Sequence, residues 1–279
     1  MNATGYDKLT VIFKPYLEAV LNGTVDHTVV TGWNVVLGNE IGMNFVMDLA
    51  GGDQVACFLG EQEIASTLSA NEDGTYNLRV AVAAAQMADE LTIKVNGEAL
   101  SRTYSVRAYA DHILTGDYDD ATKALVREML NYGAASQTYF GYNTENLANA
   151  GITVTAAEVP AEGGDFTVTG SADGISFYGA SLVHQKKIAV RFYFTAESVE
   201  GVDFGGYTPV AKDGKFYIEV ADINPQDLNA DITVTVNDSL TVSYSPLDYI
   251  IRMYAKGGNN AALVQALYGY YLAAAAYTG

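Results

Sequence analysis

The chain has 279 residues, of which 15 are basic and 33 are acidic, so its formal net charge is −18. This length suits two compact domains that each bury a core of their own. The acidic balance argues against DNA, RNA and anionic lipid as partners, because phosphate binding needs clustered Lys and Arg and no such cluster is evident along the sequence.

The surface composition is typical of an exported protein. Charged residues make up only 17% of the chain, and Gly, Thr, Asn and Tyr are abundant. The opening MNATGYDK lacks the basic stretch and long apolar run of a signal peptide, and no run reaches the roughly 18 apolar residues of a membrane span. We expect no membrane insertion. We also expect the chain to be a fragment of a larger multidomain protein located outside the cell or on its surface.

Residues 1–30 are expected to form a lead-in segment outside the repeated part of the chain. The stretch KLTVIFKPYLEAVLNG predicts a strand followed by a helix. That helix is expected to begin near Pro15, because proline suits the first helical turn.

Short strands are predicted at the start of the first module. Large apolar residues occupy every second position over 41–47 and again over 91–95, as in half-buried strands. Between them, the stretch 71–74 ends in Asp-Gly, which readily adopts the positive φ of a hairpin turn. Cys57 lies in the apolar stretch VACFLG, which predicts a buried, unreactive thiol. Several such antiparallel strands predict a small β-sandwich.

A pair of helices is predicted to follow these strands. Each helix carries an apolar stripe at the helical spacing, and small residues on the second helix permit close packing. The stripes are Val106, Tyr109, Ile113 and Leu114, and Leu125, Met129, Tyr132 and Tyr139. We expect the rings of Tyr132 and Tyr139 to be buried between the helix pair and the sheet.

The whole pattern returns once, about 140 residues further along the chain. The echoed stretches are YSVRAY (104–109) with YSPLDY (244–249), ALVREMLNYGAASQTY (124–139) with ALVQALYGYYLAAAAY (262–277), the strands 41–47 with 188–194 and 91–95 with 232–236, and the Asp-Gly turns 71–74 with 212–215. In the second copy, Ser245, Pro246 and Asp248 form a helix start, and Tyr270 and Tyr277 are expected to be buried.

These patterns predict an α+β fold of two tandem antiparallel β-sandwich-like modules, each followed by a helix hairpin. The first module is predicted over residues 31–150, and a second, degenerate copy over residues 151–279. We expect the copies to superpose with Tyr104 over Tyr244 and Tyr139 over Tyr277. The copies share apolar spacing, turn residues and caps, but almost no reactive groups.

The run from YSVRAYADHIL through VREMLNYGAASQTYFGYNTENLAN resembles a module common in large surface and secreted proteins of Gram-positive gut and rumen bacteria. In that family, a Pro-x-x-Met-x-Asp-like stretch precedes Tyr-Ser-Val and a Leu-Asn-Tyr-Gly-Ala-Ala helix. The stretches AAAQMADEL (83–91) and INPQDLNADI (223–232) take that place here; the first lacks the Pro, and the second has Leu228 for the Met. The second helix pair also lacks the Asn-Tyr-Gly portion. The resemblance spans residues 31–279 and implies an architecture and a location, with no catalytic role.

Catalytic chemistry is not indicated by any motif. The histidines His27, His112 and His184 do not recur at matching positions and do not form a metal-ligand spacing. A Ser/His/acid triad can assemble from distant residues, but no G-x-S-x-G flag supports one. We therefore assign no catalytic residue, no metal site and no cofactor, and an enzyme is the least favoured function.

The acidic cluster Asp117, Asp119 and Asp120 has two interpretations. A calcium loop is one, but Ala121 stands where the third ligand is needed and no Gly follows. A turn with an N-cap for the following helix is the other, and we favour it.

Aromatic residues are the remaining functional signal, with 20 Tyr, 10 Phe and one Trp. Sugar rings pack their C–H faces on aromatic side chains, so an exposed ring predicts a carbohydrate contact. Three aromatics lie away from the apolar stripes, in Gly-rich or Asn-rich segments that we expect to be turns. These candidates are Trp33, Tyr142 and Tyr207.

The sequence thus favours a non-catalytic accessory module of an extracellular bacterial protein that binds carbohydrate. The alternatives are a protein-interaction or adhesion module, which needs an exposed apolar patch of more than a few hundred Å², and a structural spacer. The expected partner is a polysaccharide or a surface protein.

Overall fold

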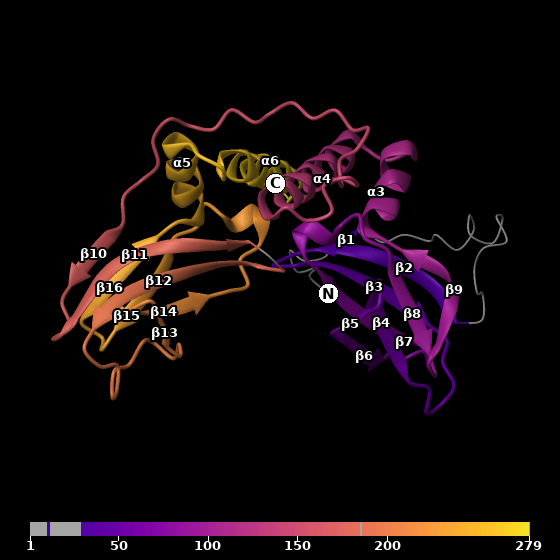
Figure 1. The fold of residues 1–279 in the computed structure, drawn as a ribbon, viewed down its shortest axis with the longest axis horizontal. Coiled ribbons are helices and arrows are strands. Elements are labelled where there is room, and N and C mark those ends of the chain that lie inside the picture. Colours follow the sequence, from indigo (N-terminus) through magenta and orange to yellow (C-terminus); the bar gives the residue numbers. More distant parts are fainter. Residues whose placement is uncertain (1–9, 12–28, 185, 279) are drawn as a thin grey trace.

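The structure is a computed structural model that describes residues 10–11, 29–184 and 186–278. Its described residues form a mixed α+β protein with four antiparallel sheets and four α-helices. Two sheets lie in each of two lobes, and the helices lie along one side of both (Figure 1). The predicted helix near Pro15 falls outside the described residues. The strand predicted before it includes β1 (Thr10–Val11), which pairs with β2.

The first lobe consists of two sheets with strand orders β1-β2-β3-β7-β6 and β5-β4-β8-β9. Besides β1, its strands are β2 (Val30–Leu37), β3 (Ile41–Met47), β4 (Val55–Leu59), β5 (Gln62–Ile64), β6 (Ser66–Ala70), β7 (Tyr76–Val82), β8 (Leu91–Val95) and β9 (Glu98–Tyr104). The predicted strands over 41–47 and 91–95 are confirmed, with Met43, Phe45 and Ile93 fully buried. Cys57 on β4 is also buried, and burial raises the pKa of its thiol to about 12. This confirms the predicted burial of the thiol.

The second lobe consists of sheets with strand orders β11-β12-β14-β13 and β10-β16-β15. Its strands are β10 (Thr167–Gly170), β11 (Ile175–His184), β12 (Ile188–Ala196), β13 (Val210–Lys212), β14 (Lys215–Val220), β15 (Ile232–Val236) and β16 (Leu240–Tyr244). Phe192, Phe194 and Ile218 point inward and are fully buried. The strands predicted over 188–194 and 232–236 are confirmed.

The two lobes differ in the segment that follows β3 in the first lobe and β12 in the second. In the first lobe, β4 and β5 lie between β3 and β7 in the sequence. In the second, the corresponding segment 197–209 is a loop that buries Phe204. The small sheet of the second lobe gains β10 instead, which pairs with β16. This added strand lies at the opposite edge of the sheet from the one that β4 and β5 occupy in the first lobe.

The predicted Asp-Gly hairpin turns are both confirmed. Asp213 and Gly214 join β13 to β14 with φ of 50° and 72°, which is why this turn needs Gly beside a short polar residue. In the first lobe, Gly74 has φ 87° in the loop between β6 and β7. There the side chain of Asp73 accepts hydrogen bonds from the backbone N and hydroxyl of Thr75, at 3.0 and 2.6 Å.

Each helix pair begins at the predicted positions. The helices are α3 (Val106–Thr115), α4 (Asp120–Phe140), α5 (Pro246–Lys256) and α6 (Ala261–Thr278), with the short 3-10 helices η1 (Ala84–Gln86) and η2 (Pro225–Asp227) before them. Ser105 caps α3 by accepting from the backbone N of Ala108, and Ser245 caps α5 by accepting from that of Asp248. Among the residues that the structure describes, no helix is long and apolar enough to cross a membrane.

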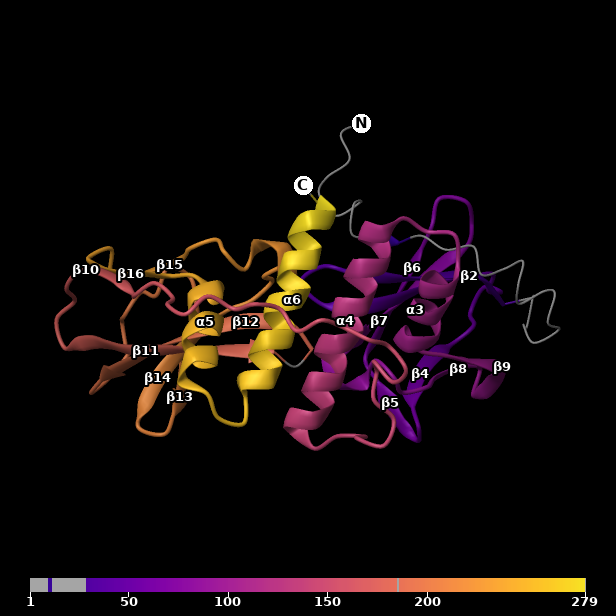
Figure 2. The same ribbon diagram turned by 90° about the horizontal axis from the view of Figure 1, so that it is seen from above.

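The long helices α4 and α6 pack against each other rather than only against their own sheets. They lie side by side between the lobes in both views (Figures 1 and 2). The rings of Tyr132 on α4 and Tyr270 on α6 are stacked, with centroids 5.9 Å apart and planes 17° apart. Both are buried as predicted, at 3% and 1% exposure, but between two helices and not between a hairpin and a sheet.

Tyr139, the penultimate residue of α4, is 38% exposed. The prediction that it is buried is wrong. Its ring lies at the rim of the helix layer, with centroids 5.0 Å from Phe140 and 6.1 Å from His184. The apolar stripe on α4 extends beyond the elements that cover the helix at this end. Leu125, Met129 and Tyr132 are therefore buried, whereas Tyr139 is not.

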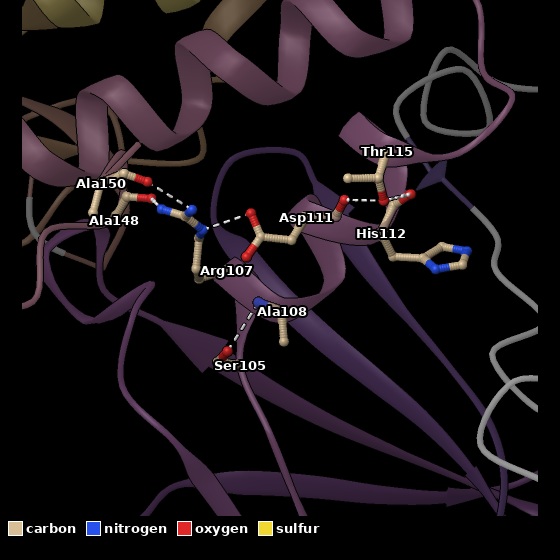
Figure 3. Close-up of polar contacts among 8 residues, drawn as sticks. All are labelled: Ser105, Arg107, Ala108, Asp111, His112, Thr115, Ala148 and Ala150. Atoms are coloured by element: carbon tan, nitrogen blue, oxygen red, sulfur yellow. Dashed lines mark hydrogen bonds and ion pairs between the residues drawn. The ribbon is translucent and has the colours of Figure 1, made fainter. Parts of the chain in front are cut away.

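The segment that links the lobes, residues 141–166, is held on the helices by polar contacts. On α3, Arg107 donates hydrogen bonds to the carbonyl oxygens of Ala148 and Ala150 and pairs with Asp111 at 2.7 Å (Figure 3). Further along the segment, Gln265 of α6 donates to the carbonyl of Ala157 at 2.9 Å. These contacts satisfy backbone groups that an irregular segment leaves unpaired.

We expect Tyr270→Ala to lower the free energy of unfolding by about 3 kcal/mol, because it removes a fully buried ring from the α4–α6 contact. Tyr270→Phe should retain most of that stability, since it keeps the ring and removes only a hydroxyl with no hydrogen-bond partner among the described residues. Urea denaturation measures both. Leu272→Ala is the control, because Leu272 on the same helix is 43% exposed. Equal losses for Tyr270→Ala and Leu272→Ala would contradict this role of the ring.

Candidate functional site

Trp33 belongs to the core and not to a turn. It lies within β2, opposite Phe45 on β3, and is only 5% exposed. Its ring is stacked near Phe45 at 6.2 Å and meets Tyr104 and Tyr109 edge-on at 5.3 and 5.0 Å. The expectation of a turn was wrong because the Gly beside it marks a bulge in the strand pairing, not the end of the strand. A buried ring offers no surface to a ligand.

Tyr142 is 40% exposed just beyond the end of α4. Its hydroxyl donates to Asp89 Oδ2 at 2.6 Å, and Asn143 Nδ2 donates to Asp89 Oδ1 at 2.7 Å. The hydrogen bond to the carboxylate raises the pKa of Tyr142. These residues line an open cavity of about 510 Å³ together with Glu90 and Asn146. The contacts tie the end of α4 to the segment before β8, so Tyr142 already has a structural partner.

Tyr207 lies in the loop between β12 and β13 and is 38% exposed. Its backbone N donates to the carbonyl of Phe204 at 3.3 Å, and Gly205 and Gly206 before it have φ of 64° and 85°. The turn predicted here is thus present. No ring contact involving Tyr207 occurs among the described residues, so it stands apart from any other aromatic platform.

Three tyrosines lie together on the outer face of the β11-β12-β14-β13 sheet. Tyr178 at the bulge in β11 is 65% exposed, the highest value among the large apolar residues. Tyr193 on β12 and Tyr217 on β14 are directly paired in the sheet and half-buried, with ring centroids 5.6 Å apart. We call the surface formed by Tyr178, Tyr193 and Tyr217 the tyrosine face.

Polar and cationic groups border the tyrosine face. Lys215 Nζ lies 4.2 Å from the ring centre of Tyr178, and Arg191 Cζ lies 4.6 Å from that of Tyr217. The hydroxyls of Ser181 and Tyr193 are 3.2 Å apart and share a hydrogen bond. Such neighbours add hydrogen-bond donors and acceptors to the apolar rings.

A hollow of about 290 Å³ opens on the same face. It is lined by Tyr178, Gly179, Ala180, Ser181, Tyr193, Lys212, Asp213 and Lys215. It therefore joins two of the three tyrosines to the β13–β14 hairpin. An aromatic wall with a few convergent polar groups is the usual composition of a small-ligand site.

The sequence analysis missed the tyrosine face although its signal was present. Inward residues on β12 were assigned at 188, 190, 192 and 194, so the same alternation places Arg191 and Tyr193 on the outer face. On β14, Tyr217 likewise points outward, between the half-buried Phe216 and the buried Ile218. Only Tyr178 lies beyond this rule, because a bulge shifts the register between Phe177 and Gly179.

The acidic cluster forms a helix cap. Asp119 accepts hydrogen bonds from the backbone N of Thr122 at 2.7 Å and from its hydroxyl at 2.8 Å, and both lower the pKa of Asp119. Asp120 is the first residue of α4 and lies at the positive end of its dipole. The cap interpretation is confirmed. Within the described part of the chain, no three His, Cys, Asp or Glu side chains gather as metal ligands.

The described histidines lie apart from each other and from the tyrosine face. His112 lies on α3, and its ring is 6.5 Å from that of Tyr118. His184 ends β11 beside Tyr139 and Phe140, and burial lowers its pKa to about 4. His27 falls outside the described residues.

No protein-family model matches the chain, and a search of curated proteins finds no match. The case for a function thus rests on the geometry of the tyrosine face.

We expect the stability of the protein to fall as the pH falls from about 6.5 towards 4, in part because of His184. The folded state holds this side chain neutral, whereas the unfolded state takes up a proton below its ordinary pKa of 6.5. At pH 4.5 the difference amounts to about 2.5 kcal/mol. Urea denaturation at pH 7 and pH 4.5 should thus show a smaller pH-dependent loss for His184→Gln than for wild type. Equal losses would contradict the burial of this imidazole.

Proposed function

We propose that the chain is a non-catalytic accessory module of an extracellular or cell-surface bacterial protein, and that it binds carbohydrate on the tyrosine face. The observation that carries the proposal is that three neighbouring tyrosines, one exposed and two half-buried, share the outer face of one sheet. Tyr178 presents most of its ring to solvent, and the paired rings of Tyr193 and Tyr217 continue the surface across two more strands. Sugar rings pack their C–H faces on such aromatic surfaces.

The strand pairing of this sheet does not require aromatic rings on the outer face. Val46 and Asn77 are paired across β3 and β7 in the first lobe, where Tyr193 and Tyr217 are paired across β12 and β14. The first sheet is formed without aromatic rings at these positions. Large rings that a sheet does not need, placed where solvent reaches them, support a binding role.

The proposal includes a tandem duplication as the origin of the two lobes. Strand orders β2-β3-β7-β6 and β11-β12-β14-β13 support it, as does the 140-residue spacing of the two serine caps, Ser105 and Ser245. In the first copy, Asp89 of the Met-x-Asp stretch binds Tyr142 and Asn143 of the Gly-Tyr-Asn segment. Ala230 takes the place of that Asp in the second copy. The residues that make this contact lie within the stretches that resemble modules of Gram-positive surface proteins.

Calorimetric titration of a panel of soluble neutral and acidic oligosaccharides tests the binding proposal. We expect at least one to bind with micromolar to millimolar affinity, about 4 to 8 kcal/mol. Tyr178→Ala and Tyr217→Ala should each weaken it at least tenfold, about 1.4 kcal/mol, because they remove stacking area. Tyr178→Ala should leave the melting temperature nearly unchanged, since its ring is mostly exposed.

Tyr207→Ala and Tyr142→Ala are the comparison variants, because both remove exposed rings away from the tyrosine face. Binding that survives both tyrosine-face substitutions but is lost in Tyr142→Ala would move the site to the cavity beside Asp89. No binding across the whole panel would reject the carbohydrate proposal in favour of a protein-interaction module or a spacer.

A further inference from the structure

Basic residues gather on the same sheet as the tyrosine face. Residues 175–196 and 210–220 contain five basic and two acidic residues, a net charge of +3 in a chain whose total is −18. The basic residues are Lys186, Lys187, Arg191, Lys212 and Lys215, and the acidic ones are Asp213 and Glu219. Up to 29 positions separate the five along the chain. The sequence therefore shows no cluster, and the sheet creates one.

The cations on this sheet differ in whether a carboxylate lies close enough to neutralise them. Glu219 pairs with Arg191 at 2.9 Å and lies 3.9 Å from Lys187. Neither Lys212 nor Lys215 takes part in an ion pair among the described residues. Lys186 also takes part in no ion pair among the described residues, but of these three lysines only Lys212 and Lys215 line the hollow beside Tyr178.

Lys212 and Lys215 both line the hollow on the tyrosine face. Lys215 Nζ is held over the ring of Tyr178, at 4.2 Å from its centre. An exposed cation–π contact of this kind is weak, so the ammonium turns towards an anion at little cost. At about 290 Å³ the hollow is near the lower limit of ligand cavities, roughly 300 Å³, which suits a group of sugar-ring size.

The first lobe provides an internal comparison. By the register of the repeat, Glu72 and Thr75 stand where the second lobe has Lys212 and Lys215. The paired Val46 and Asn77 stand where it has two tyrosines. The two cations and the two rings therefore occur together in the second lobe, and none of the four matching positions in the first lobe carries a cation or a ring.

We propose that the tyrosine face binds an anionic oligosaccharide, with a sugar ring packed on Tyr178 and its acidic group held by Lys212 and Lys215. This inference rests on the carbohydrate-binding function proposed above. The acidic remainder of the chain repels polyanions at long range, but salt screens charges beyond about 10 Å at 0.1 M ionic strength. The positive charges of Lys212 and Lys215 then determine the affinity for an acidic sugar at short range.

Tetragalacturonic acid and its fully methyl-esterified form test the proposal, because they share the same rings and differ in charge. Titration calorimetry of the full chain in 50 mM NaCl should show at least tenfold tighter binding of the acid. Lys212→Gln and Lys215→Gln should each weaken binding of the acid about fivefold and leave binding of the ester unchanged. Tyr178→Ala should weaken both. A sulfated galactan tetrasaccharide with the same lysine dependence would identify sulfate as a second acceptable acidic group.

Lys256→Gln is the matched charge control, because Lys256 is exposed at the end of α5, away from the tyrosine face. An equal loss in this variant would show a long-range charge effect and overturn the assignment, as would comparable binding of poly-glutamate. Equal affinity for acid and ester would overturn the inference while leaving the carbohydrate proposal intact. If no oligosaccharide binds, neutral or acidic, both proposals fail together.

Discussion

The contact between α4 and α6 is the interaction on which the rest of the structure depends. Each helix is connected to a different lobe, and among the described elements α4 and α6 form the most extensive contact between the lobes. The stacked rings of Tyr132 and Tyr270 lie within this contact and are almost completely buried. A second, smaller contact joins the lobes where the backbone of Ile188 donates to the carbonyl of Asn39 at 3.4 Å. Burial of apolar area between the helices thus fixes how the two lobes are placed.

This arrangement leaves the outer sheet faces free. Because the helices occupy one side of both lobes, the sheet β11-β12-β14-β13 is not needed for contact between the lobes beyond its β11–β12 end (Figure 1). The positions on its outer face do not have to pack against the other lobe, and tyrosines and lysines occupy several of these positions. In the first lobe, Val46 and Asn77 form the matching strand pair without an aromatic ring. A rigid sheet then presents the rings at fixed separations, which reduces the entropy lost on binding.

The sequence predicted local structure well because strand alternation, serine caps and Asp-Gly turns are set by neighbouring residues. The sequence did not predict which element each apolar stripe packs against. An apolar stripe indicates that one face of a helix is buried, but it does not indicate which element covers that face. That is why Tyr132 and Tyr139, on one stripe, differ so much in burial. Trp33 was misplaced because a glycine in a bulge resembles a glycine in a turn. Lys212 and Lys215 lie near Tyr178 because strands that are distant in the sequence belong to one sheet. The composition of the chain contains no information about such strand pairing.

Differential scanning calorimetry of the intact chain most directly tests the claim that the helix contact makes one unit of two lobes. The account predicts a single transition whose van't Hoff and calorimetric enthalpies agree, because unfolding either lobe exposes the buried face of α4 or α6. Two resolved transitions, or a van't Hoff enthalpy near half the calorimetric value, would show that the lobes unfold independently and would contradict the account.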